Sequence, residues 1–293
     1  MFVLENIILK SIIEGVHLAV YSSIKPGSIH RLRLDSEAQV IVSNTLSVID
    51  YIIEAINYGE KIRRGDIALT SIEIGKLIAK ALRESYRWNS GRVYPQLIIP
   101  QLIYSIALSH SNVDSFLEGS GKVRESLKAI LSINRWSEIR EIINVLNSSG
   151  RRDMYEHLEA TGITRLANIG SSVSLSELFR VLSSRWIGFS TLDIVEYNIP
   201  VYVKKLIDYY RTYKDTTSSI IALYLDFIRD KSPNWVREYI DQSLKYKLMT
   251  TREGAKILFE LDNKMRRENI IYDEYVHLLA LVIALGVFDG LRP

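Results

Sequence analysis

One short stretch near the amino end of the chain concentrates residues that can bind an anion. The stretch SSIKPGSIHRLRL (22–34) interrupts an apolar, helix-like segment. Proline fixes φ at the second position of a turn and glycine accepts positive φ at the third, so Lys25 to Ser28 has the signature of a type II turn. His30 and Arg31 follow this turn. Backbone N–H groups at such a turn, with lysine and arginine nearby, can hold phosphate by charge-assisted hydrogen bonds.

The residue types alone leave two interpretations of this turn open. In the first, the turn is the lip of a pocket, and Lys25, Gly27, Ser28 and Arg31 contact the phosphate of a ligand. In the second, the turn is a plain connector between two helices, and its charged side chains lie in solvent.

The turn also resembles a motif of a known family, the triphosphoribosyl-dephospho-CoA synthases in their archaeal branch. That family carries a Lys-Pro-Gly-Asn-Val-x-Arg region, in which His precedes the Arg in the archaeal branch. Five residues of this chain match it: Lys25, Pro26, Gly27, His30 and Arg31. Later segments are similar in the family's order. Residues 193–197 look like its Asp-x-x-x-Tyr segment, residues 260–269 like its Leu-x-x-Leu-Asp-x-x-Leu-Arg stretch, and residues 289–292 like its closing Gly-x-Arg.

The resemblance implies an all-helical transferase that moves the triphosphoribosyl group of ATP onto the ribose of dephospho-CoA and releases adenine. This reaction breaks a glycosidic carbon–nitrogen bond through a positively charged sugar centre, so it requires cations around the triphosphate and an acid–base group. By the resemblance, Lys25 and Arg31 bind phosphate and His30 orients a group or accepts a proton. Asp193 and Asp273 are the candidate carboxylates, and Mg²⁺ bound with ATP bridges the phosphates.

The chain departs from the family pattern at three places. Ala19 stands where the family tends to carry a glutamate, residues 89–96 lack the Asn-Thr-x-x-Gly motif, and residues 269–271 read Asn-Ile-Ile in place of Asn-Pro-Gly. Isoleucine neither allows a close backbone approach to phosphate nor coordinates a metal. Three outcomes therefore remain open: the family reaction, a different reaction or ligand on the same scaffold, or a catalytically inactive helical protein that acts as a binding or interaction module.

The segments that position these residues have the periodicity of helices. Apolar side chains recur every three or four residues in 4–19, 77–82 and 136–146, whereas strand-like alternation is scarce. No glycine-, serine- or proline-rich linker is long enough to separate domains. We therefore predict an all-α fold of about ten or more helices in a single domain, residues 1–293.

Capping residues and prolines add detail to this prediction. Ser174–Glu177 and Thr250–Glu253 have the pattern of capping boxes, and Ser232-Pro233 has that of an N-cap followed by a first-turn proline. Pro100 and Pro200 lie inside apparent helices, so each is expected to kink or divide its helix.

Two other motif types are weak. The five histidines lack the spacing of a metal site, so no resident metal is predicted. Gly119–Lys122 is similar to half of a phosphate-binding loop, but no strand precedes it and the full glycine spacing is missing. We interpret this segment as a connector.

Composition limits the partners and the compartment. The net charge is +3, from 37 basic and 34 acidic residues spread along the chain, so no nucleic-acid-binding surface is expected. Cysteine is absent, which excludes disulfides and favours a reducing compartment. Glu5, Lys10 and Glu14 interrupt the apolar amino end, so no export signal is expected and the predicted location is cytoplasmic.

An apolar run, Val276–Phe288, lies close to the carboxyl end. It is shorter than the ~20 residues of a bilayer span, so we expect no membrane partner and interpret the run as a buried helix. Such an apolar segment packs either inside the protein or against a second copy. A homodimer is therefore the alternative to complete burial within one chain.

Overall fold

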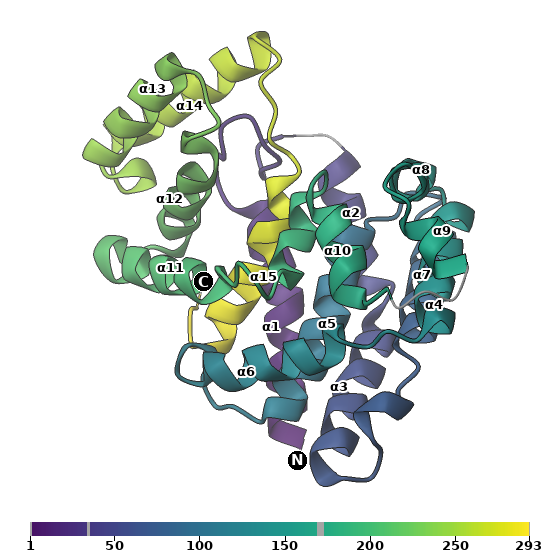
Figure 1. Ribbon diagram of the computed structural model, residues 1–293. Coiled ribbons are helices and arrows are strands. Elements are labelled where there is room, and N and C mark those ends of the chain that lie inside the picture. Colours follow the sequence, from purple (N-terminus) through teal and green to yellow (C-terminus); the bar gives the residue numbers. More distant parts are fainter. Residues whose placement is uncertain (1, 34–35, 169–172, 293) are drawn as a thin grey trace.

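Helices alone make up the regular structure of the residues that the computed structural model describes, which are 2–33, 36–168 and 173–292. The prediction of an all-α fold with ten or more helices is confirmed (Figure 1). The first part of the chain forms α1 (Phe2–Tyr21), α2 (Ser36–Leu46), α3 (Ile49–Arg64), η1 (Leu69–Ser71), α4 (Ile74–Trp88), α5 (Pro95–Ser111), α6 (Phe116–Leu131), α7 (Trp136–Ser148), α8 (Arg152–Ala160) and α9 (Ile163–Asn168). The second part forms α10 (Leu175–Ser183), η2 (Ile187–Leu192), α11 (Ile199–Tyr213), α12 (Thr216–Arg229), α13 (Asn234–Lys245), η3 (Leu248–Thr250), α14 (Arg252–Arg267) and α15 (Tyr275–Phe288). The η elements are 3₁₀-helices.

Helix α15 lies at the centre of the hydrophobic core. Every residue from Tyr275 to Phe288 is buried, and the helix packs along α1, as Figure 1 shows. Gly15 allows this close approach, because a Cβ at its position would lie 2.6 Å from Ala280 O and 2.6 Å from Ala284 Cβ. The prediction that the apolar carboxyl-terminal run is a buried helix is therefore confirmed, and its burial is achieved within a single chain.

Helices α13 and α14 form a hairpin at one end of the molecule (Figure 1). The two helices pack mainly on each other, on η3 and, through α13, on α12. The loop that follows α1 lies between this hairpin and the remaining helices. This arrangement places the turn at residues 25–28 against α14, which is more than two hundred residues away in the sequence.

The helix starts agree with the sequence to within one residue. Ser174 and Glu177 form the predicted capping box. Helix α13 begins at Asn234 with Pro233 at its N-cap, so its predicted start was one residue early. Helix α14 begins after Thr251, whose hydroxyl accepts a hydrogen bond from Gly254 N at 3.1 Å, so the predicted cap at Thr250 was wrong by one position.

The two prolines behave differently from one another. Pro200 is the second residue of α11, where no backbone N–H is needed, so it marks the start of a helix and does not kink its interior. Helix α5 continues undivided across Pro100, which leaves the carbonyl of Gln96 without its helical donor. Gly188 packs against this carbonyl, and its missing side chain allows the contact.

The segment Gly119–Lys122 lies within α6, so its interpretation as a connector was wrong. Within the described ranges, none of the helices is by itself long and apolar enough to cross a bilayer, and only α2 and α3, taken together across a bend of 42°, pass that test of length and composition.

Candidate functional site

The lysine–proline–glycine turn has the predicted backbone geometry. Ser28 N donates to Lys25 O at 3.0 Å, and Gly27 has a φ of +70°. Arg31 N donates to Ser22 O at 3.2 Å, which closes the loop around the turn. The side chains of Lys25, Ser28 and His30 are buried, whereas Arg31 is exposed. The lysine of the turn therefore does not lie in solvent, as a plain connector with solvated charges would place it.

Lys25 is the most unusual residue of this turn, because its side chain is 0% exposed. Its Nζ donates to Ser22 Oγ at 2.7 Å, and the described residues offer it no second hydrogen-bond partner and no ion pair. Burial lowers the pKa of Lys25 from 10.5 to about 7, against the opposing effect of the Asp273 carboxylate. Near neutral pH the side chain is thus present as both amine and ammonium.

Two fully buried hydroxyl groups lie at the turn, one on Ser28 and one on Tyr224. The Tyr224 hydroxyl donates to Pro26 O at 2.6 Å. Ser28 Oγ has no hydrogen bond of normal geometry within the described part of the chain. Burial raises the pKa of Tyr224, and the nearby Ser28 hydroxyl partly opposes this rise. The turn therefore keeps a second polar group, besides Lys25, whose hydrogen-bonding capacity is not fully used.

The carboxylate of Asp262, on α14, holds the turn from the opposite side. Its Oδ1 accepts from Gly27 N at 2.9 Å, and its Oδ2 accepts from Arg266 Nε at 2.7 Å and lies 3.4 Å from His30 Nε2. Burial favours the protonated acid, but the hydrogen bonds from His30, Arg266 and the Gly27 amide outweigh it and lower the pKa of Asp262. Asp262 is therefore an ionised internal carboxylate at neutral pH.

Two contacts of His30 favour one of its tautomers. Leu32 N donates to Nδ1 at 3.3 Å, so Nδ1 carries the lone pair, and Nε2 carries the proton and faces the Asp262 carboxylate. Arg266 Nη2 lies 3.1 Å from the same Nε2, but a guanidinium only donates, so this contact is not a hydrogen bond in that tautomer. His30 can accept a proton only at Nδ1 and would lose the Leu32 hydrogen bond by doing so. This arrangement favours an orienting role for His30 over that of a general base.

The space directly in front of the turn is filled. A Cβ at Gly27 would lie 2.5 Å from Met265 Cε and 2.8 Å from Ile270 O, so only glycine fits here. Tyr272 N donates to Gly27 O at 2.7 Å. Five well-formed cavities among the described residues have no residue of the turn in their lining. In this conformation the donors of the turn are enclosed.

The two predicted carboxylates lie in different surroundings. Asp273 is close enough to Lys25 to raise its pKa, and it accepts from Arg33 Nη1 at 2.7 Å. Asp193 lies at the end of η2, where its Oδ1 accepts from Val195 N at 2.8 Å and from Glu196 N at 3.1 Å. The structure thus brings Asp273 to the turn, whereas the described hydrogen bonds of Asp193 stabilise its own loop.

Sequence reasoning missed Asp262, Arg266 and Tyr224 as parts of the site. Asp262 and Arg266 are four residues apart in the segment 260–269, so their ion pair on one helix face can be seen in the sequence. Their common partner cannot, because Gly27 lies 235 residues before Asp262.

One cavity adjoins the segments that carry Asp193 and Asp273. It has a volume of about 240 Å³ and lies between η2, α11, α12 and α15, with Ser190, Lys205 and Lys231 among its lining residues. Lys205 Nζ pairs with Asp226 at 2.9 Å, and Lys231 lies 5.1 Å from the centre of the Tyr275 ring. Ligand pockets for drug-sized molecules start at about 300 Å³, so this cavity is too small for a whole nucleotide.

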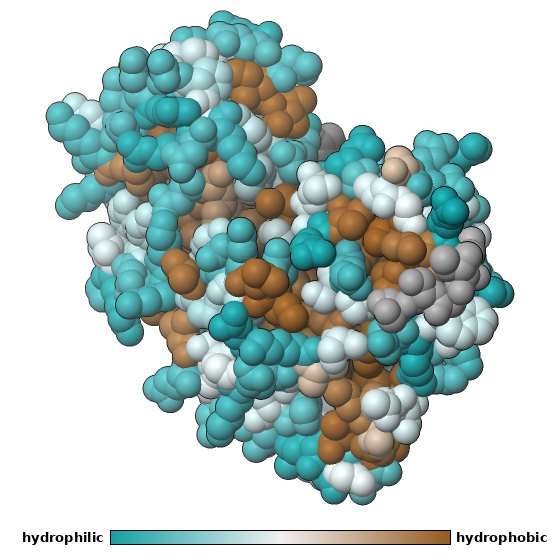
Figure 2. Space-filling model, in the orientation of Figure 1, coloured by the Kyte–Doolittle hydropathy of each residue, from teal (hydrophilic) through white to brown (hydrophobic). Residues whose placement is uncertain are grey.

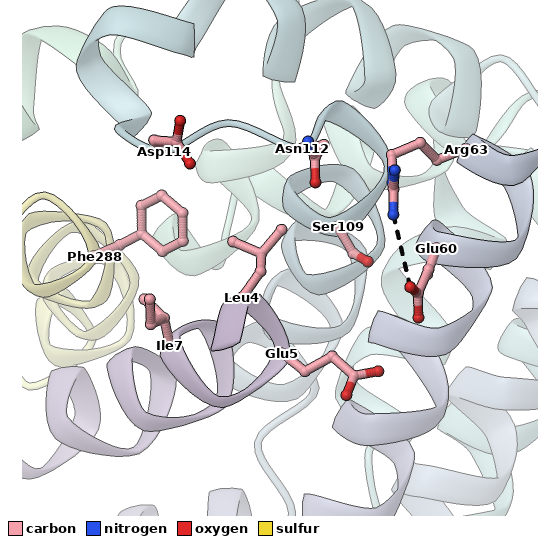
Figure 3. A pocket seen from close by; sticks show the side chains of 9 residues that line it. All are labelled: Leu4, Glu5, Ile7, Glu60, Arg63, Ser109, Asn112, Asp114 and Phe288. Atoms are coloured by element: carbon pink, nitrogen blue, oxygen red, sulfur yellow. Dashed lines mark ion pairs between the residues drawn. The ribbon is translucent and has the colours of Figure 1, made fainter. Parts of the chain in front are cut away.

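Two of the larger cavities have the wrong charge for phosphate, whereas a third, of about 470 Å³, is lined by Lys10 and Arg292 beside one acidic residue, Glu14. The cavity of about 730 Å³ beside Trp88 is lined by the carboxylates of Asp50, Glu54 and Glu84. The cavity of about 350 Å³ in Figure 3 has Leu4, Ile7 and Phe288 on one side and the Glu60–Arg63 ion pair on the other. Glu5 and Asp114 also line it, so acidic side chains outnumber basic ones here as well.

The described residues do not provide a resident Mg²⁺ site. They contain no group of three or more acidic or histidine side chains that could hold a metal ion. At the turn, Asp262 and Asp273 each already accept a hydrogen bond from an arginine. The Mg²⁺ of the resembled reaction could arrive only with the phosphates of its nucleotide, which supply most of its ligands in such sites.

Comparisons with protein-family models, curated proteins and solved structures gave no match to this chain. The resemblance to the triphosphoribosyl-dephospho-CoA synthases therefore rests on the short motifs of the sequence.

Proposed function

We propose that this chain binds a small molecule with phosphate groups, of nucleotide or CoA type, at the turn of Lys25. The observation that carries this proposal is the buried Lys25, which has one hydrogen bond and no ion pair among the described residues. An incompletely paired buried charge costs several kcal/mol, and an apolar side chain of similar length would avoid that cost. An anionic ligand that completes the hydrogen bonds of the ammonium accounts for a lysine at this position.

The specific form of the proposal follows the resemblance: transfer of the triphosphoribosyl group of ATP to dephospho-CoA. Lys25 and the backbone amides of the turn would hold phosphate oxygens. Asp273, with its side chain 30% exposed, is the carboxylate near Lys25 that could take the proton of the attacking hydroxyl. His30 would orient the turn through Asp262 and Leu32.

One observation favours a second candidate function, a catalytically inactive helical module that binds a partner. Met265 and the Ile270 carbonyl fill the space in front of Gly27, as they would in a turn that serves only to join α14 to the core. The face shown in Figure 2 carries several separate hydrophobic patches and no single large one. A partner that docks on a broad apolar surface therefore gains no support from this face.

Isothermal titration calorimetry with ATP and with dephospho-CoA, each with and without Mg²⁺, tests the proposal, and chromatography detects released adenine in parallel. We expect heat of binding for the wild type and at least about a tenfold loss of ATP affinity in Lys25→Met, which removes the charge and keeps the length of the side chain. Lys61→Met is the matched control, because Lys61 is exposed at the end of α3. The absence of both heat and adenine would favour the inactive module, as would an unchanged affinity in Lys25→Met.

A further inference from the structure

Three hydrogen-bond donors converge on the Asp262 carboxylate. The Gly27 amide and His30 belong to the turn, and Arg266 belongs to α14. A backbone amide, an imidazole N–H and a guanidinium together form a donor set that binds phosphate as readily as carboxylate. The side chain of Asp262 is 10% exposed, whereas that of Arg266 is 34% exposed, so solvent reaches the edge of this group from the side of Arg266.

From this geometry we infer that the Gly27 amide, His30 and Arg266 form an anion-binding site that the Asp262 carboxylate fills in this structure. A phosphate group of the ligand takes the place of the carboxylate, and α14 then moves away from the turn. The inference deepens the proposed function, on which it rests, because it names the residues that meet the phosphate and the element that must move. It assigns binding roles to Arg266 and to the amide of Gly27, and it makes the α13–α14 hairpin a lid.

The contacts that α14 itself makes with the turn come from one short face, and Ile270 O and Tyr272 N in the segment after α14 also meet Gly27. Asp262, Met265 and Arg266 are one turn of helix apart and all meet Gly27 or His30. The hairpin otherwise packs on itself, on η3 and on α12 (Figure 1). Replacement of the carboxylate by a phosphate therefore removes the ionic link between α14 and the turn without requiring changes in the core around α15.

Release of α14 also uncovers the polar groups beneath the turn. Lys25 and the Ser28 hydroxyl belong to the same turn as Gly27 and are fully buried, and both have unused hydrogen-bonding capacity. Among the described residues, Asp273 is the acidic side chain that acts on Lys25, and it pairs with Arg33 at 2.7 Å. A second phosphate group of the same ligand can therefore accept hydrogen bonds from Lys25 and from the Ser28 hydroxyl.

The variant Asp262→Asn tests this inference, with inorganic tripolyphosphate as the probe in calorimetry. Asparagine keeps an oxygen for the Gly27 amide but presents an amide nitrogen to Arg266 and His30, which weakens the internal occupant. We expect Asp262→Asn to bind tripolyphosphate about tenfold more tightly than the wild type, which corresponds to about 1.4 kcal/mol. Asp241→Asn is the matched control, because Asp241 lies on α13 of the same hairpin and pairs at 2.7 Å with Arg229 of α12, and not with a residue of the turn.

The outcomes separate this inference from the proposed function. If neither protein binds tripolyphosphate or ATP, the proposed function fails and the inference fails with it. If both bind with equal affinity, the proposed function stands and the inference is wrong. Should Asp262→Asn not fold, Arg266→Gln replaces it. That variant is expected to lose about tenfold in affinity, and an affinity equal to the wild type would overturn the inference.

Hydrogen exchange gives a second readout that a purely structural ion pair would not change. Saturation of the wild type with tripolyphosphate is expected to speed amide exchange in residues 252–267, because the ligand displaces the carboxylate that ties α14 to the turn. Slower or unchanged exchange in α14 on saturation would contradict the lid.

Discussion

Two glycines, at two places in this molecule, allow the backbone to approach a neighbour closely, and their surroundings differ. At Gly15, α1 packs against Ala280 and Ala284 of α15 within an apolar core. At Gly27, the turn packs against Met265 of α14, but Lys25 and Ser28 lie buried beside it. The contact at Gly15 is apolar packing, which the stability of the fold is enough to explain. The second buries a charge and a hydroxyl that stability does not require, and it is there that we expect function.

The same contrast extends to the polar partners of the two regions. The α1–α15 contact is made by helices whose backbone groups are satisfied within each helix. The turn instead depends on single hydrogen bonds from distant residues, such as Gly27 N to Asp262 at 2.9 Å and Tyr272 N to Gly27 O at 2.7 Å. Contacts of this kind can be exchanged for contacts with a ligand, whereas the core of α15 cannot be opened without unfolding.

The largest expected effect is in the core. In Gly15→Val, the new Cβ would lie 2.6 Å from the Ala280 carbonyl, so α1 and α15 must separate. We expect a loss of about 3 kcal/mol in the free energy of unfolding, measured by urea denaturation followed by circular dichroism. The folded fraction should bind ATP with unchanged affinity. A stability equal to that of the wild type would show that the glycine contact does not matter.

The opposite sign is expected at the turn. Lys25→Met removes a buried charge and fills nearly the same volume, so the free energy of unfolding at pH 7 should rise by about 2 kcal/mol. The same urea experiment measures it, with Lys61→Met as the control. A variant that is less stable than the wild type would mean that Lys25 serves the fold, and the comparison between the two regions would no longer hold.

The pH dependence of stability sharpens this prediction. The pKa of Lys25 is lowered to about 7 in the folded protein and returns to its ordinary 10.5 on unfolding, so the unfolded chain binds more protons between these values. Stability should therefore rise with pH from about 7 toward 10, and more steeply in the wild type than in Lys25→Met. Measurements between about pH 7.5 and 9.5 avoid the titration of histidines and tyrosines. Equal slopes in the two proteins would contradict the buried, lowered pKa.

The smallest expected effect belongs to Arg31, which matches the family motif but is exposed. In Arg31→Ala, stability should change by less than about 0.5 kcal/mol, because surface substitutions rarely exceed this. The affinity for tripolyphosphate should fall by less than about threefold, since solvent screens an exposed charge. A loss as large as that in Lys25→Met would place Arg31 inside the site.

Much of the fold could be predicted from local patterns in the sequence. The apolar stripe of α1 and the capping box at Ser174 needed only neighbouring residues. The amino end of α6 has a local and a distant cap: Ser115 accepts from Glu118 N at 3.3 Å, and Asp289 accepts from Leu117 N at 2.9 Å and also from Phe116 N. The pattern of Ser115 and Glu118 is local and was missed, whereas the contact with Asp289, 172 residues away, leaves no signal in the local sequence.

The local part of the site could be predicted from the sequence, but its partners from distant helices could not. The turn at Lys25 could be read from proline and glycine, because its geometry is local. The burial of Lys25, the carboxylate of Asp262 and the engaged nitrogens of His30 depend on which helices meet at the turn. Those are tertiary properties, and one sequence does not contain them in any short pattern.

The most direct test of the central claim is the number of protons taken up when a ligand binds. At pH 8, free Lys25 is mostly neutral, since its pKa is about 7, and a bound phosphate would raise that pKa and draw in a proton. Calorimetry of tripolyphosphate binding in two buffers of different ionisation enthalpy measures this uptake. We predict an uptake approaching one proton for the wild type and none for Lys25→Met at concentrations that saturate it. Binding without proton uptake by the wild type would contradict the claim that Lys25 meets the anion.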